Sequence, residues 1–161
     1  MAKGAGDTRA SKWSGDIYSI GVKRYEYRDL PKSSQAIVRK ERDRIAKAMY
    51  AKLQNVSTPQ VIDGGEKIDI RYTKSGIDEF ANQAMVTLSG KYFSEKSMLS
   101  VNEILGRSSY VPTPHTLSHP RKDKRDLWFS YKDADGRGVY FRVCWNQNMK
   151  MYELYSVADR I

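Results

Sequence analysis

Apolar residues recur at helical spacing along a segment that begins at Pro31-Lys32 and runs to about Gln54. The other side of this predicted helix is basic, although Glu41 and Asp43 interrupt the run of cations. It is therefore either a surface for an acidic partner or an ordinary solvated face. The apolar side consists of Ile37, Val38, Ile45, Met49 and Leu53.

Two shorter helices are predicted in the middle of the chain. Thr73 or Ser75 caps the first, which runs from Ile77 to about Met85. The second follows Ser94, because apolar residues recur there at helical spacing. Its apolar face consists of Met98, Leu99, Val101, Ile104 and Leu105.

Alternation of polar and apolar residues predicts β-strands at residues 67–72, 127–132, 139–145 and 151–157. Tyr110-Val111 adds a short extended piece. The order of these elements predicts an α+β fold in which two helices pack on a small, mostly antiparallel sheet.

A loop divides the chain after the long helix. Thr58-Pro59 and Asp63-Gly64-Gly65 are turn residues, so we expect no regular structure between that helix and the first strand. On this basis residues 1–60 form a basic N-terminal appendage with one long helix, and residues 66–161 form the α+β core.

The charge of the chain changes the picture, because it indicates a kind of partner. The 161 residues include 28 Lys and Arg against 19 Asp and Glu, a net charge of +9, and residues 1–60 hold 13 of these cations and 6 of the acids. Such an excess favours a polyanion: nucleic acid first, an acidic membrane surface or an acidic protein second. On the long helix we assign nucleic-acid binding to Arg39, Lys40 and Arg42.

Cysteine usage and hydropathy bear on the compartment. Cys144 is the single cysteine, so the chain forms no internal disulfide and nothing indicates an oxidising compartment. No apolar run approaches the ~18 residues of a membrane span, and the first residues lack the apolar stretch of a signal peptide. We therefore expect a cytoplasmic protein, or one carried inside a particle, with no membrane partner.

Both histidines, His115 and His119, lie in a basic segment between Pro114 and the C-terminal strands. Imidazole titrates near neutral pH, so either can serve as base or acid in the cleavage of a phosphodiester. The same loop can equally bind a phosphate without cleaving it. A zinc ion would need further ligands that the sequence does not clearly supply, so we expect no metal and no cofactor. The cations of this segment that we assign to nucleic-acid binding are Arg121, Lys122, Lys124 and Arg125.

Aromatic and cationic residues alternate with apolar ones in the C-terminal strands. Trp128 and Arg142 fall on the more polar face of the predicted sheet, and any cleft is expected on that face. Aromatic side chains among cations on an exposed sheet can stack nucleobases. They are also common in ordinary antiparallel strands, so the pattern alone does not decide.

Several of these segments together resemble a known family. They are Ile70-x-Tyr-Thr-Lys-Ser-Gly-Ile-x-Glu79, the Leu99-x-x-x-x-Ile104-Leu105 helix with the Tyr-Val piece, the Leu127–Tyr131 and Gly138–Val143 strands, and Tyr152-x-x-Tyr-Ser156. In this order they resemble the phage-associated branch of the barnase/EndoU/colicin D/RelE-like (BECR-type) nucleases, over residues 68–158.

The resemblance implies a ribonuclease-like α+β fold, metal-independent cleavage of RNA, and a role as a packaged phage effector or a toxin module. Clefts in that family are lined from the sheet by His, Arg, Lys and Ser or Thr. No acidic residue stands out here as a general base of the barnase type, so a histidine would be the base, or Lys and Tyr would act as in RelE-like toxins. The positions that fit the cleft are His115, His119, Arg121, Arg142 and Ser156.

Three functions remain open. The first is a phage or mobile-element RNase-like effector, with His119, His115, Arg142 and Ser156 as catalytic residues. The second is a non-catalytic phage or mobile-element protein that binds nucleic acid or capsid components, and the third is an unrelated structural protein. For the first two, RNA is the foremost expected partner, with a capsid, portal or immunity protein beside it. The expected location is the cytoplasm of a bacterial host or the inside of a phage particle.

Overall fold

The structure is a computed structural model that describes residues 27–87, 93–112, 126–132 and 138–158. They form an α+β fold with a six-stranded mixed sheet. The described helices are α2 (Lys32–Leu53), α3 (Lys74–Asn82), α4 (Glu95–Leu99) and α5 (Val101–Gly106). The strands are β1 (Thr58–Val61), β2 (Lys67–Arg71), β3 (Ser109–Val111), β4 (Asp126–Lys132), β5 (Gly138–Asn146) and β6 (Met151–Ala158). Short turns of helix are η1 (Tyr27–Asp29), η2 (Asp63–Gly65) and the π-helical η3 (Gln83–Thr87).

The sheet has the order β1-β2-β6-β5-β4-β3, and only β2 and β6 run parallel. The predicted α+β class is confirmed. The sheet is nevertheless larger than the small, mostly antiparallel one that we expected, because the N-terminal hairpin joins it through the β2–β6 pairing. The predicted second helix is also divided, since α4 and α5 meet at Ser100.

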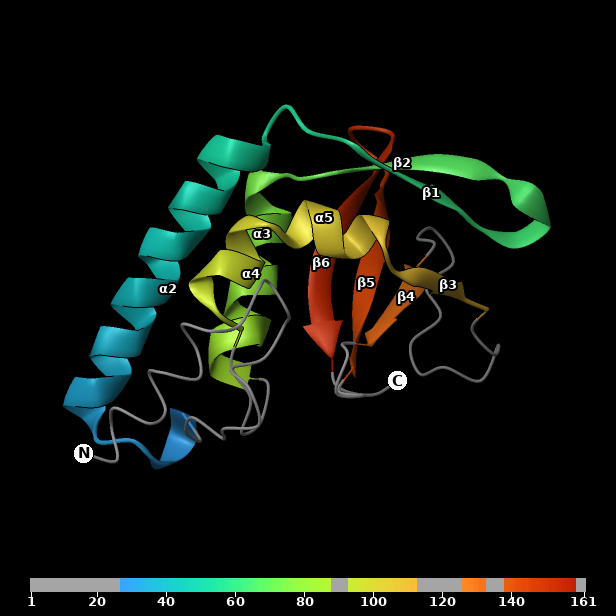
Figure 1. Cartoon of the computed structure of the whole chain (residues 1–161). Helices are drawn as coiled ribbons and strands as arrows, with labels where there is room; N and C mark the ends of the chain where they lie inside the picture. Colours follow the sequence, from blue (N-terminus) through green and yellow to red (C-terminus); the bar gives the residue numbers. More distant parts are fainter. Residues whose placement is uncertain (1–26, 88–92, 113–125, 133–137, 159–161) are drawn as a thin grey trace.

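Strand β1 lies where the sequence predicted a loop. Thr58 pairs with Ile70 across the β1–β2 hairpin, which reaches away from the rest of the molecule in Figure 1. Pro59 misled the prediction because proline has no N–H for a ladder, but β1 is an edge strand that pairs with β2 alone, where proline is tolerated. Gly64 and Gly65 close the hairpin with φ angles of 72° and 78°, which favour glycine.

Helix α2 packs against α3 and α4 on one side of the sheet (Figure 1). Its bounds match the predicted helix. Ile45, Met49 and Leu53 are at most 1% exposed and belong to the same core as the sheet residues Ile70 and Phe141. The division of the chain into an appendage and a core stays a prediction, but the buried side of α2 is part of one continuous core.

Helix α3 is anchored at its first turn on strand β6. Thr73 caps it by accepting a hydrogen bond from the Gly76 N–H, as the sequence predicted. Gly76 lies so close to β6 that a Cβ there would be 2.3 Å from the Leu154 carbonyl oxygen. Farther along α3, Phe80 packs its ring against Phe141 of β5 and Phe93. This close approach places the start of α3 beside the polar residues of β6.

Candidate functional site

A hollow formed by the described residues lies between α2, α3 and the turn that joins β5 to β6. We call it the α2–β6 groove; its volume is about 910 Å³. A smaller pocket of about 580 Å³ adjoins it and shares Tyr50, Lys74, Ser75 and Asp78 with it. The groove is lined by Arg42, Asp43, Ala46, Lys47, Tyr50, Lys74, Ser75, Asp78, Glu79, Asn82, Trp145, Asn146, Gln147, Asn148, Glu153 and Tyr155.

Glu153 is the buried acidic residue of this groove. Its side chain belongs to β6 and the residue is 6% exposed. One carboxylate oxygen accepts a hydrogen bond from the Thr73 hydroxyl, and the other accepts one from the Asn146 Nδ2 at 3.0 Å. Thr73 stands at the start of α3 and Asn146 at the end of β5, so the carboxylate is fixed from two elements. Buried carboxylates require such partners, because desolvation penalises an unpaired charge.

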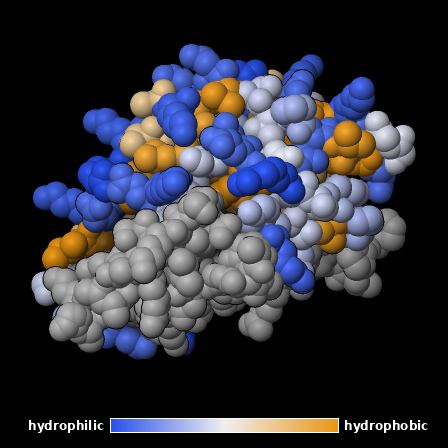
Figure 2. Space-filling model, in the orientation of Figure 1, coloured by the Kyte–Doolittle hydropathy of each residue, from blue (hydrophilic) through white to orange (hydrophobic). Residues whose placement is uncertain are grey.

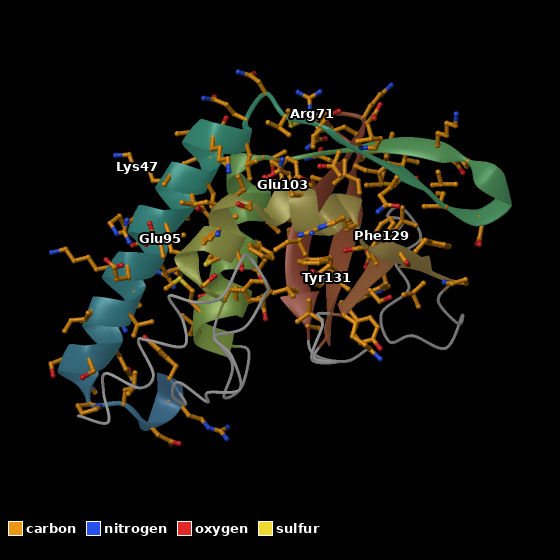
Figure 3. The ribbon with its side chains drawn as sticks, in the orientation of Figure 1. Lys47, Arg71, Glu95, Glu103, Phe129 and Tyr131 are labelled. Carbon is orange, nitrogen blue, oxygen red and sulfur yellow. The ribbon has the colours of Figure 1, made fainter. Side chains whose placement is uncertain are left out.

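Charges of both signs line the groove. The α2 side supplies Arg42, which donates to Asn82 on α3 at 2.9 Å and pairs with Asp43 at 3.1 Å. Lys74 pairs with Asp78 one turn later at 3.4 Å. Lys47 has no ion pair with another described residue and projects outward from α2 (Figure 3). The charges of the groove therefore nearly balance, and one cation, Lys47, has no ion pair with another described residue.

Arg142 lies on β5 and is held by an acidic partner. Its Nη2 and Nε donate to Asp126 on β4 at 2.6 and 3.2 Å. The guanidinium also lies over the Tyr155 ring, 5.4 Å from its centre. Burial opposes the charge of Arg142, but the hydrogen bond to Asp126 and the nearby Cys144, Asp126 and Tyr155 together outweigh it and raise the pKa of Arg142 above its ordinary value. Arg142 is thus a fixed cation, joined to the groove through Tyr155.

The structure brings three of the predicted site residues together. Arg142 is the register partner of Trp128 on β4 and of Ser156 on β6. Residues that face each other across antiparallel strands share a face of the sheet. Ser156 is buried and is not among the residues that line the groove. Trp128 and Arg142 are thus opposite each other on β4 and β5, whereas their predicted roles stay predictions.

The predicted cations of α2 fall into two groups. Arg42 lines the groove, as described above. Arg39 donates to the Tyr27 hydroxyl at 2.5 Å, which holds the chain before the helix. Lys40 is exposed and makes no ion pair with a described residue. Hydrophilic side chains predominate on the coloured part of this side of the molecule in Figure 2.

The histidine segment lies outside the described residues. This applies to His115, His119, Arg121, Lys122, Lys124 and Arg125. Their predicted roles stay predictions from the sequence. Within the described ranges, no group of three or more His, Cys, Asp and Glu is placed to bind a metal ion. No described helix is both long and apolar enough to cross a membrane.

The central members of the groove do not stand out in the sequence. Glu153 is one residue of an alternating strand there. The available signal was an acidic residue between Tyr152 and Leu154, both of which are buried. Tyr155 sits at an irregularity where the β5–β6 register shifts after Arg142, so simple alternation could not place it.

Comparison of the chain with protein-family models, with curated proteins and with solved structures gives no match.

Proposed function

We propose that the protein binds RNA along the basic surface of α2 and cleaves it in the α2–β6 groove without a metal ion. The observation that carries this proposal is the buried Glu153 carboxylate, held by Thr73 and Asn146 inside a groove beside a basic helix. Helix α2 contains seven Lys and Arg against two acidic residues. A positively charged surface next to a fixed proton acceptor is what metal-independent RNA cleavage requires.

The proposed reaction begins at the ribose 2′-hydroxyl. Glu153 takes its proton, and the 2′-oxygen attacks the adjacent phosphorus. The bond from phosphorus to the 5′-oxygen then breaks, which leaves a 2′,3′-cyclic phosphate and a 5′-hydroxyl. Lys47, the groove-lining cation that has no ion pair with another described residue, stabilises the negative charge on the phosphorane, as positioned cations do.

The departing 5′-oxygen needs a proton from an acid. Among the described residues that line the groove, Tyr155 is a candidate for this acid, since it lies two positions from Glu153 on β6. His119 remains the alternative that the sequence predicts. Tyr155→Phe and His119→Ala separate the two, because only the variant that removes the acid slows cleavage strongly.

The test compares Glu153→Gln with Glu103→Gln on single-stranded RNA in the presence of EDTA. Glutamine preserves the size of the buried side chain but cannot take a proton, so Glu153→Gln is expected to lose cleavage by about 10²-fold or more. Glu103 is an exposed carboxylate on α5, outside the groove, and its variant is the matched control (Figure 3). Thermal unfolding of both variants checks the fold.

Full activity of Glu153→Gln would remove Glu153 as the base. If the wild type cuts no RNA but binds it, the non-catalytic nucleic-acid-binding function takes its place. One observation favours that second function: Arg142 is already paired with Asp126, so its guanidinium is not free to stabilise a phosphorane.

A further inference from the structure

We propose that the α2–β6 groove is a subsite for a single unpaired nucleobase. This inference rests on the proposed function for its biological setting, but it concerns what the groove recognises rather than whether RNA is cut. The volume of about 910 Å³ lies within the range of pockets that enclose small ligands.

The balance of charges in the groove does not favour a site that binds only a phosphate group. Its described lining holds three cations, Arg42, Lys47 and Lys74, against four carboxylates. Arg42 and Lys74 are moreover paired with Asp43 and Asp78. A phosphate in the interior of the groove would meet as much repulsion as attraction, whereas an uncharged polar ligand would not. The scissile phosphate therefore belongs at the rim, beside Lys47.

The polar groups left open in the groove suit the edge of a base. Four amide side chains line it, at Asn82, Asn146, Gln147 and Asn148. Asn146 is used internally, since it donates to Glu153 and accepts from the Met149 N–H at 2.9 Å. Gln147 accepts from the Trp145 indole at 3.0 Å through its Oε1, which leaves its Nε2 as a donor for a ligand. Amides and carboxylates together offer the donors and acceptors that a base edge requires.

Aromatic side chains supply the surface for stacking. Tyr50, Trp145 and Tyr155 line the groove from α2, β5 and β6. Contacts with neighbouring side chains hold two of these rings in place. Trp145 packs edge-on against Tyr152, with the ring centres 4.9 Å apart, and the Tyr155 ring lies under the Arg142 guanidinium. Fixed aromatic rings bind unpaired bases with little loss of side-chain entropy. A base in a duplex is already stacked and paired, so the groove selects single strands.

The experiment titrates uncharged nucleosides into the full chain and follows the amide signals of Gln147 and Asn148 and the Trp145 indole signal by NMR. Variants Gln147→Ala and Asn148→Ala assign these signals. Ribose 5-phosphate, which carries a phosphate but no base, is the matched ligand. Asn55→Ala, an exposed amide outside the groove, is the matched control variant.

At least one nucleoside is expected to shift the groove signals, and Gln147→Ala is expected to weaken its binding by about fivefold while Asn55→Ala leaves it unchanged. Shifts caused by ribose 5-phosphate but by no nucleoside, or by neither ligand, would overturn the inference. The outcome is independent of cleavage: RNA that is cut while nucleosides miss the groove refutes the base subsite alone. Nucleosides that bind while no RNA is cut refute the proposed cleavage alone.

Discussion

Thr73 links the local structure of one residue to the site. Its side chain accepts from the Gly76 N–H, which caps α3, and its hydroxyl donates to Glu153. A hydroxyl can do both at once, whereas an ionised carboxylate or an ammonium group cannot. The residue that starts the helix is therefore the residue that orients the buried acid.

Tyr72, the residue before Thr73, makes the free energy of unfolding sensitive to pH in the alkaline range. It is 2% exposed and shares a hydrogen bond with Thr58 of β1. Burial raises the pKa of Tyr72 far above its ordinary value, and the hydrogen bond to Thr58 reverses only part of that change. The unfolded chain releases this proton near pH ~10, whereas the folded chain retains it.

The expected consequence is a loss of stability as the pH rises above ~10, because the unfolded state then binds fewer protons than the native state. Tyr72→Phe removes this contribution, at a cost of about 1 kcal/mol at neutral pH for the lost hydrogen bond. Urea unfolding at pH 8 and pH 11 measures it: the wild type should lose about 1 kcal/mol more than the variant over this interval. Equal losses in both proteins would show that Tyr72 titrates normally when folded.

At the scale of elements, the contact between α3 and β6 sets the shape of the groove. Replacing glycine by alanine inside a helix normally stabilises it, by up to about 1 kcal/mol. Gly76→Ala is expected to do the opposite, because the new methyl group would lie 2.3 Å from the Leu154 carbonyl and 3.0 Å from a Glu153 oxygen. Such overpacking costs about 1–3 kcal/mol.

Gly106→Ala is the control for this prediction. Gly106 ends α5, and a Cβ there would make an ordinary 3.5 Å contact with Thr58. Chemical denaturation should therefore show a lower midpoint for Gly76→Ala and an unchanged or slightly higher one for Gly106→Ala. If both variants have the same denaturation midpoint, the start of α3 does not pack as closely against β6 as described.

Most helices and strands could be predicted because each carries a local signal. The apolar spacing of α2 and the alternation of β4 and β5 are read directly from neighbouring residues. Strand β1 could not be predicted, since Pro59 signals a turn and only the partner β2 makes it a strand. The groove could not be predicted either, because Arg42 and Glu153 are brought together by packing and not by spacing.

At the scale of the whole molecule, α2 is both the basic surface and part of the core. Its outer side carries Lys40 and Lys47, whereas Ile45, Met49 and Leu53 are buried. The position of the groove beside the basic surface follows from this double role, because the buried side fixes the helix against α3.

A chain that begins at residue 61 is therefore expected to lose its cooperative unfolding transition. Truncating one large buried side chain costs about 2–5 kcal/mol, and this deletion removes three such side chains together with most of β1. A chain that begins at Tyr27 keeps every described element and is the control. Thermal unfolding followed by circular dichroism tests this expectation. If the shortened chain unfolds in the same cooperative transition as the control, residues 1–60 are a separable appendage.

Ultraviolet crosslinking of a single-stranded RNA to the wild-type protein, with the attached residues identified by mass spectrometry, tests the central claim most directly. Light joins bases to the aromatic rings that they touch, so it reports where the strand lies without any substitution. The expected attachment sites are Tyr50, Trp145 and Tyr155, which line the groove. Attachment confined to Tyr110 and Tyr131, on β3 and β4 outside the groove, would contradict the claim that the α2–β6 groove receives RNA.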